Sequence, residues 1–133
     1  MSVNGADARI IGGFSVHGNA SDIIFHRLTI RNPEKLGQGD GVTIKGSLTD
    51  PINAHPHHIW IDHCTFVDCA DEMVDCSRAS GYVTLSGNKL YYTRDNGHNC
   101  CNLTGGAGDN DKGNYQVTWC SMGSAPGATL IVT

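Results

Sequence analysis

Apolar and polar residues alternate in four short segments of the chain that share one pattern. The segments are Ile23–Ile30, Ile59–Phe66, Val83–Leu90 and Val117–Met122. Each opens with β-branched or aromatic residues at alternate positions and carries another apolar residue after a short polar corner. Alternation with a period of two is typical of β-strands that bury one face. The pattern therefore predicts a repeat built from strands.

Shorter apolar pieces lie between these segments, at Val42–Ile44, Met73–Asp75 and Thr129–Ile131, and a weaker fifth copy of the repeat is expected at Ile10–Val16. No window of ten or more residues has an apolar face at the helical period together with capping residues. Each repeat therefore reads as strand, corner, strand, loop, strand. Loops of unequal length are expected at 31–41, 47–58, 67–72 and 93–114.

Two all-β arrangements compete for this pattern. An antiparallel sandwich predicts tight turns such as Asp40-Gly41 or Asn96-Gly97 between neighbouring strands, but neither pair lies between two well-alternating segments. Parallel strands that stack about 4.8 Å apart, like residue over like, account for the repeat better. We therefore predict a single domain over residues 1–133, built as a parallel β-helix of four to five coils.

Composition and charge narrow the functional classes. The chain has 133 residues with 17 glycines and a formal net charge of −4. The absence of a basic stripe argues against a nucleic-acid partner. The sequence has no apolar run long enough to span a membrane, and Met1–Ile10 lacks the features of a signal peptide.

Six cysteines leave the redox state open. They are Cys64, Cys69, Cys76, Cys100, Cys101 and Cys120. An even count fits disulfides formed in an oxidising compartment, but six cysteines allow 15 pairings and the sequence does not choose among them. Free thiols buried in a β core are the alternative.

Several ordered motifs resemble one family. The stretch Ile59–Phe66 reads Ile-Trp-Ile-Asp-His-Cys-Thr-Phe, and further matches lie at 21–30, 39–44, 71–75 and 80–86. Together they resemble the pectate lyases of polysaccharide lyase family 1, from about Ile10 to Thr118. The resemblance implies a right-handed, single-stranded parallel β-helix and a secreted protein.

The resemblance also implies a calcium site and a reaction. Asp40, Asp71 and Asp75 match the family's Ca²⁺ ligands, and Gln38 stands at a fourth ligand position. Calcium prefers several oxygen ligands, and it offsets the negative charge of an acidic sugar beside the bond to be cleaved. The expected activity is calcium-dependent cleavage of pectate (polygalacturonate) by β-elimination, which releases unsaturated oligogalacturonides. The retained acids favour pectate over methylated pectin.

The catalytic base is not assigned by the resemblance. The family's enzymes are about twice as long or more, so we expect coils to be absent at both ends. The family's Arg-x-Pro-x-x-Arg segment has no counterpart, and no arginine follows Arg94. Arg78, Arg94 and Lys112 remain candidates for the base. The Asp62-His63 pair is expected to bond within the stack, with an acid/base role as the alternative. Trp60 and Trp119 are expected in the core, with stacking on a sugar as the alternative.

Two rival functions and one physical consequence stay open. The residues His55, His57, His58, Asp62 and His63 form a cluster that suits a transition metal. A non-catalytic β-helix fragment that keeps calcium or polysaccharide binding is the other rival. Open coil ends expose unpaired strand edges, which predicts self-association.

Overall fold

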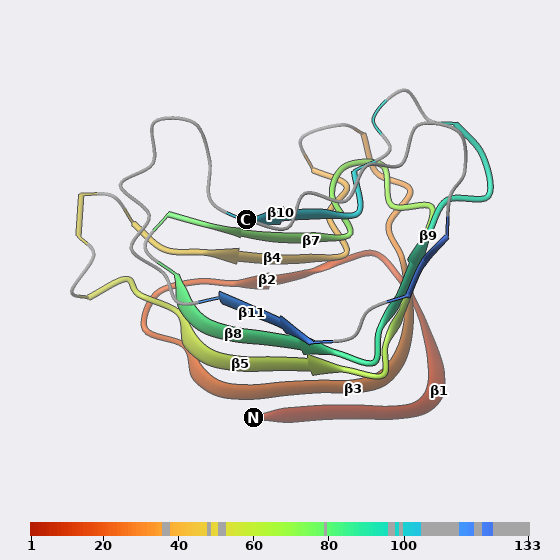
Figure 1. Ribbon diagram of the computed structural model, residues 1–133. Helices are drawn as coiled ribbons and strands as arrows, with labels where there is room; N and C mark the ends of the chain where they lie inside the picture. The colour runs from red at the N-terminus through yellow and green to blue at the C-terminus, as the bar shows by residue number, and fades with distance from the viewer. Residues whose placement is uncertain are drawn as a thin grey trace.

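The computed structural model is all-β in the part of the chain that it describes. It describes residues 1–35, 38–47, 49–50, 53–78, 80–95, 98, 100–104, 115–118 and 121–123, without the side chains of 3–7, 115–118 and 121–123. Twelve strands and no helix lie within these ranges, so none of them holds a helix of the length and hydropathy that crossing a membrane requires. The strands form two parallel sheets (Figure 1).

The larger sheet has eight strands. They are β1 (Ser2–Ile11), β3 (Ser21–Arg31), β5 (His57–Asp62), β6 (Thr65–Val67), β8 (Gly81–Ser86), β9 (Lys89–Tyr91), β11 (Tyr115–Thr118) and β12 (Ser121–Gly123). The long strand β3 pairs with β5 along its first half and with β6 along its second. The sheet therefore turns a corner, which is seen where β3 bends upward in Figure 1.

The smaller sheet has four strands and lies across from the larger one. Its strands are β2 (Phe14–Val16), β4 (Val42–Lys45), β7 (Val74–Ser77) and β10 (Asn102–Thr104), in the order β10-β7-β4-β2. All its pairings are parallel. These parallel strands, joined by corners and loops, are consistent with a β-helix.

The register confirms the first three copies of the repeat. Ile23 pairs with Ile59, which pairs with Val83. After the corner, Thr65 pairs with Thr29 on one side and with Lys89 on the other. Like residues therefore stand over like residues, as the shared pattern predicts.

The outer copies differ from the predicted alignment. Val117 pairs with Leu85, so Tyr115 is the residue over Val83. At the other end Ile10 pairs with Ile30, so the preceding copy begins at Ser2. For the last copy the shift is two residues, which keeps every side chain on the same face, so apolar alternation does not distinguish its two alignments. The first copy differs by more than this, and the register of β1 against β3 also changes between Asn4 and Ala8. The segment Thr129–Ile131 lies outside the described residues.

The predicted loop at 93–114 was wrong in one part, because it contains strand β10. Asn102 pairs with Val74, and Leu103 pairs with Asp75. The strand is short and begins with a polar residue, so it shows no apolar alternation. Pairing with β7 rather than local preference defines it.

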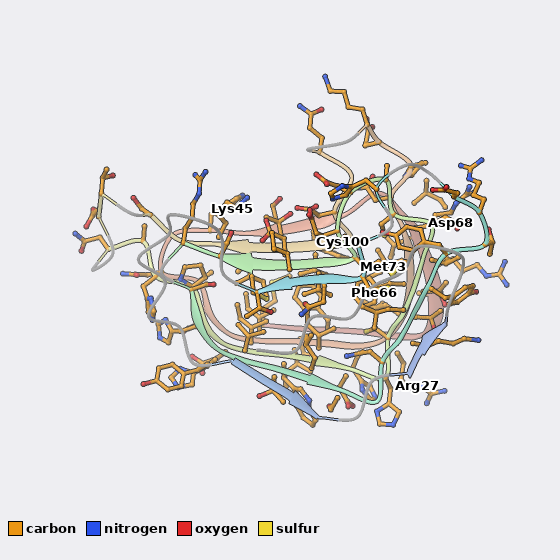
Figure 2. All side chains as sticks on the ribbon, turned by 45° about the horizontal axis from the view of Figure 1, so that its top comes forward. Arg27, Lys45, Phe66, Asp68, Met73 and Cys100 are labelled. Carbon is orange, nitrogen blue, oxygen red and sulfur yellow. The ribbon has the colours of Figure 1, made fainter. Side chains whose placement is uncertain are left out.

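Single residues with positive φ form the corner of the larger sheet. Arg27, His63 and Gly87 have φ of 55°, 50° and 60° and follow the paired residues His26, Asp62 and Ser86. A left-handed residue at the same place in each copy turns the chain sharply. Figure 2 shows Arg27 at this corner.

The core fills the space between the two sheets. Ile30, Phe66 and Leu90 come from the larger sheet, Val42 and Val74 come from the smaller one, and all five are almost completely buried. Phe66 and Met73 lie in the interior in Figure 2. No disulfide joins the five cysteines of the described ranges to one another, and Cys64, Cys69, Cys76 and Cys101 are buried. Cys120 lies outside those ranges.

Candidate metal centre

Carboxylates gather where strands β4 and β7 begin. Asp40 precedes β4, and Asp75 lies in β7 opposite Thr43 of β4. The Asp40 carboxylate accepts hydrogen bonds from the Thr43 hydroxyl and from the backbone N–H of Glu72, at 3.2 Å from Oδ1. Parallel pairing thus brings acids from successive repeats to one end of the smaller sheet.

Asp75 is a buried carboxylate with one unsatisfied oxygen. Its side chain forms an ion pair with Lys45, whose Nζ lies 2.9 Å from Oδ2. Oδ1 is buried and has no hydrogen-bond partner among the described residues. Burial raises the pKa of Asp75, the charge of Asp40 raises it further, and Lys45 acts in the opposite direction. A buried acceptor without a partner is costly, so this oxygen is suited to a cation.

A second group of ligand atoms forms around the segment that precedes β7. His98 Nε2 lies 3.3 Å from Asp71 Oδ1 and 3.1 Å from Glu72 Oε1. Burial raises the pKa of Glu72 to about 7, with the charge of Asp71 adding to the effect and the His98 hydrogen bond opposing it. The ligand atoms of these three residues lie within 4.8 Å of one another. Asp40 and Asp75 stand outside that group.

The sequence prediction missed Glu72 and His98. Glu72 follows Asp71 directly, so a pair of adjacent acids was the available signal. His98 lies in the segment between β9 and β10, and nothing in the sequence near it points to Asp71. Only the folded chain brings the two together.

The remaining predicted site residues lie in different places. Gln38 is exposed in the segment before β4, and Arg78 is exposed directly after β7. Arg94 is exposed after β9. Lys112 lies outside the described residues. Arg78 therefore directly follows the strand that carries Asp75, and Gln38 lies two residues before Asp40.

Asp62 and His63 bond within the stack, as predicted. The Asp62 carboxylate lies 2.9 Å from His26 Nδ1 through Oδ2 and 2.9 Å from His63 Nδ1 through Oδ1. Ser86 of the next strand donates a further hydrogen bond to Oδ1. Burial acts to raise the pKa of Asp62, but the bonds from Ser86, His63 and His26 outweigh it and lower the pKa.

The predicted histidine cluster divides into two parts. His55 stacks on His57 with ring centroids 5.4 Å apart, and His58 stacks on Tyr82 at 5.0 Å. His63 and Asp62 instead form a group of possible metal ligands with His26, from another repeat.

The prediction that Trp60 lies in the core was wrong. Its side chain is 43% exposed. The indole N–H donates to Ser86 Oγ at 2.7 Å. Trp60 alternates with the buried Ile59 and Ile61, so it lies on the outer face of β5. Trp119 lies outside the described residues.

The donors at β4 and β7 fit a hard cation. Asp40, Asp71 and Asp75 offer carboxylate oxygens, and Glu72 adds another beside them. Calcium takes six to eight oxygen ligands in flexible geometry. The unsatisfied Oδ1 of Asp75 and the raised pKa values of Asp75 and Glu72 both indicate negative charge that lacks enough compensation.

Comparison with known proteins gives a consistent result. The chain is 41% identical over 81 residues to a pectate trisaccharide-lyase of Thermotoga sp. strain RQ2, covering 60% of this chain and 21% of that protein. It is 32% identical over 134 aligned positions to "Probable pectate lyase 22" of Arabidopsis thaliana, covering 86% of this chain and 28% of that protein.

The extent of these matches is limited. The chain spans between a fifth and a third of the length of these curated relatives. No protein-family model and no solved structure matches it. The relatives from both organisms are named as lyases of pectate, one a pectate trisaccharide-lyase and the other a probable pectate lyase. The chain is therefore related to the pectate lyases.

Proposed function

We propose that the chain carries the calcium-binding part of a secreted pectate lyase, which cleaves polygalacturonate by β-elimination. The corresponding fold is a right-handed parallel β-helix of four to five coils. The relatives' names support the activity. The parallel strands and the recurring corners support the fold.

The observation that carries this proposal is the environment of Asp75. Asp75 is buried, one of its carboxylate oxygens has no hydrogen-bond partner in the described part of the chain, and its neighbours include the charge of Asp40. Asp71 is close to it in the sequence, so these three carboxylates are suited to binding a cation. Asp40, Asp71 and Asp75 would hold the ion, with Glu72 and Gln38 next to them in the chain. At this place a Ca²⁺ ion would supply positive charge that offsets the substrate carboxylate, which would make the neighbouring C–H bond more acidic.

β-Elimination requires no reactant other than the polymer. A base takes the proton from C5 of a galacturonate unit, and the electron pair of that C–H bond forms the C4–C5 double bond. The C4–O bond breaks, and its oxygen leaves with the bonding pair and gains a proton. Arg78, Arg94 and Lys112 remain the candidates for the base. A cationic side chain must lose its proton to serve in this role.

The test follows ultraviolet absorbance of the unsaturated product on polygalacturonate at mildly alkaline pH. Absorbance that needs calcium, is lost with a chelator and is lost in Asp75→Ala supports a working lyase. The control is Asp50→Asn, because Asp50 is an exposed carboxylate that bonds Asn53 and lies away from these acids in the chain. The control should keep full activity.

A measurement of calcium binding distinguishes the rival function, a non-catalytic β-helix that binds calcium, from the absence of a calcium site. Calorimetric titration with Ca²⁺ that gives binding in the wild type but not in Asp75→Ala, without any absorbance, would mean a non-catalytic β-helix that keeps the metal site. The absence of both calcium binding and product absorbance in the wild type would overturn the proposal.

A further inference from the structure

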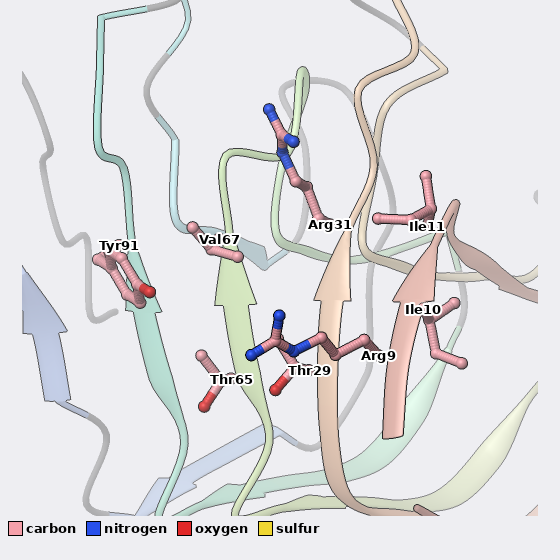
Figure 3. Close-up of a pocket in the computed structure, with 8 residues that line it drawn as sticks. All are labelled: Arg9, Ile10, Ile11, Thr29, Arg31, Thr65, Val67 and Tyr91. Atoms are coloured by element: carbon pink, nitrogen blue, oxygen red, sulfur yellow. The ribbon is translucent and has the colours of Figure 1, made fainter. Parts of the chain in front are cut away.

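A groove of about 450 Å³ lies on the outer face of the larger sheet, beyond the corner. Arg9, Thr29, Arg31, Thr65 and Tyr91 contribute to its lining, with apolar residues between them. Figure 3 shows these side chains projecting from β1, β3, β6 and β9. The groove is distinct from the acids, which belong to strands β4 and β7 and the segments before them.

The strand register assembles this groove from two outward rows. Arg9 pairs with Thr29, which pairs with Thr65, which pairs with Lys89. Two positions along, Ile11 pairs with Arg31, and Val67 pairs with Tyr91. The row between them, which contains Ile30, Phe66 and Leu90, faces the core. Alternation therefore directs both outer rows away from the core.

The groove carries uncompensated positive charge. Arg9 and Arg31 line it, Lys89 stands next to Thr65 in the first row, and no carboxylate is among the lining residues. Within the described ranges, none of these three cations forms an ion pair. This concentration is notable in a chain with a net charge of −4. A local positive field in a hollow attracts anions.

Two features of the groove favour an acidic saccharide as its ligand. Arg31 Nε is buried and has no hydrogen-bond partner in the described part of the chain. A guanidinium binds a carboxylate in a planar, two-bond arrangement. The lining also includes the Thr29 and Thr65 hydroxyls, near Arg9 in Figure 3, and the Tyr91 side chain, which supply the polar and flat apolar contacts that a saccharide needs. Lys89 Nζ lies 4.7 Å from the centre of the Tyr91 ring.

We propose that this groove is a second binding site for an acidic oligosaccharide, with Arg9, Arg31 and Lys89 pairing with uronate carboxylates. The choice of a polyuronate as the occupant rests on the proposed function. The site needs no calcium, because its own cations supply the charge. It would hold the polymer on the protein at a position other than that of the carboxylates.

The experiment measures binding of a galacturonate hexasaccharide by calorimetry, in the presence of a chelator and at low salt. Wild type should bind, and affinity should fall as salt rises. Arg9→Ala and Arg31→Ala should each weaken binding about fivefold. The affinity of Arg31→Lys should lie between those of wild type and Arg31→Ala, because lysine keeps the charge but lacks the planar guanidinium that forms two hydrogen bonds with a carboxylate. Lys35→Ala, which removes an exposed cation outside the lining residues, should bind like wild type.

Three results would overturn the site. One is equal binding by wild type and both arginine variants when circular dichroism shows all to be folded. Another is equal binding of the fully methyl-esterified hexasaccharide, which lacks the carboxylates. The third is tighter binding of a single-stranded oligonucleotide that the arginine variants abolish. Loss of lyase activity with intact chelator-resistant binding would instead count against the proposed function alone.

Discussion

Asp62 shows how one side chain ties three repeats together. It accepts bonds from His26 of β3, from its neighbour His63 and from Ser86 of β8. The pKa of Asp62 is lowered in the folded chain. A lowered pKa means that the carboxylate stabilises the fold above its ordinary value of 3.8, and that this contribution is lost as the pH falls through the lowered value.

We expect Asp62→Asn to lower the free energy of unfolding by about 2 kcal/mol at neutral pH, because hydrogen bonds to a charged group are lost. The difference from wild type should shrink in acid, where the wild-type carboxyl is also neutral. Urea unfolding at several pH values measures both effects. Asp50→Asn is the control, and a difference for Asp62→Asn that does not change with pH would contradict the assignment.

At the scale of the element, the left-handed corner determines where the chain turns: β5 and β8 end at it, whereas β3 continues through it. Gly87 occupies the corner position that Arg27 and His63 hold in earlier copies. A Cβ at Gly87 would lie 3.0 Å from atoms of the His63 ring. Gly18 has nearly the same φ, 62° against 60°, but a Cβ there meets nothing within 4 Å. Substituting each glycine by alanine therefore distinguishes the cost of backbone strain, which both sites share, from the cost of steric crowding, which occurs only at Gly87.

We expect Gly18→Ala to destabilise the fold by about 1 kcal/mol through left-handed strain alone. Gly87→Ala should cost about 1 to 2 kcal/mol more, because the imidazole must shift. Urea unfolding of both variants is the measurement. In the double variant Gly87→Ala, His63→Ala the extra cost should be largely relieved. Equal destabilisation by the two glycine variants would rule out the crowding.

At the scale of the whole molecule, the sheets have edges that invite pairing. In the described part of the chain, β1 lies at one edge of the larger sheet, and β2 and β10 lie at the edges of the smaller one. Parallel strands at an edge present unpaired N–H and C=O groups to another copy. Self-association through these ends remains a prediction.

We expect the mass in solution to rise with protein concentration, because edge pairing between copies obeys mass action. Sedimentation velocity over a wide concentration range is the measurement. Moderate salt should leave this association intact, since backbone hydrogen bonds rather than surface charges carry it. A mass that stays at 14.2 kDa at every concentration would contradict the prediction.

The strand repeat was predictable because it depends on local alternation. The copies at Ile23, Ile59 and Val83 stand in the predicted register. The copy at Val117 was misplaced by two residues, since burial of one face is the same in both registers. Strand β10 was missed, because its first residue is polar and its partner strand defines it.

The sequence by itself determined the all-β class, the order of strand and corner, and three acids close to the starts of two paired strands. Those features follow from periodicity and from short-range spacing. Only the tertiary structure decided that His98 meets Asp71 and Glu72, and that Arg9, Arg31 and Lys89 share one face. No basic run exists along the chain, but parallel stacking places neighbouring strands about 4.8 Å apart, so side chains far apart in the sequence share one face and their charges add in space.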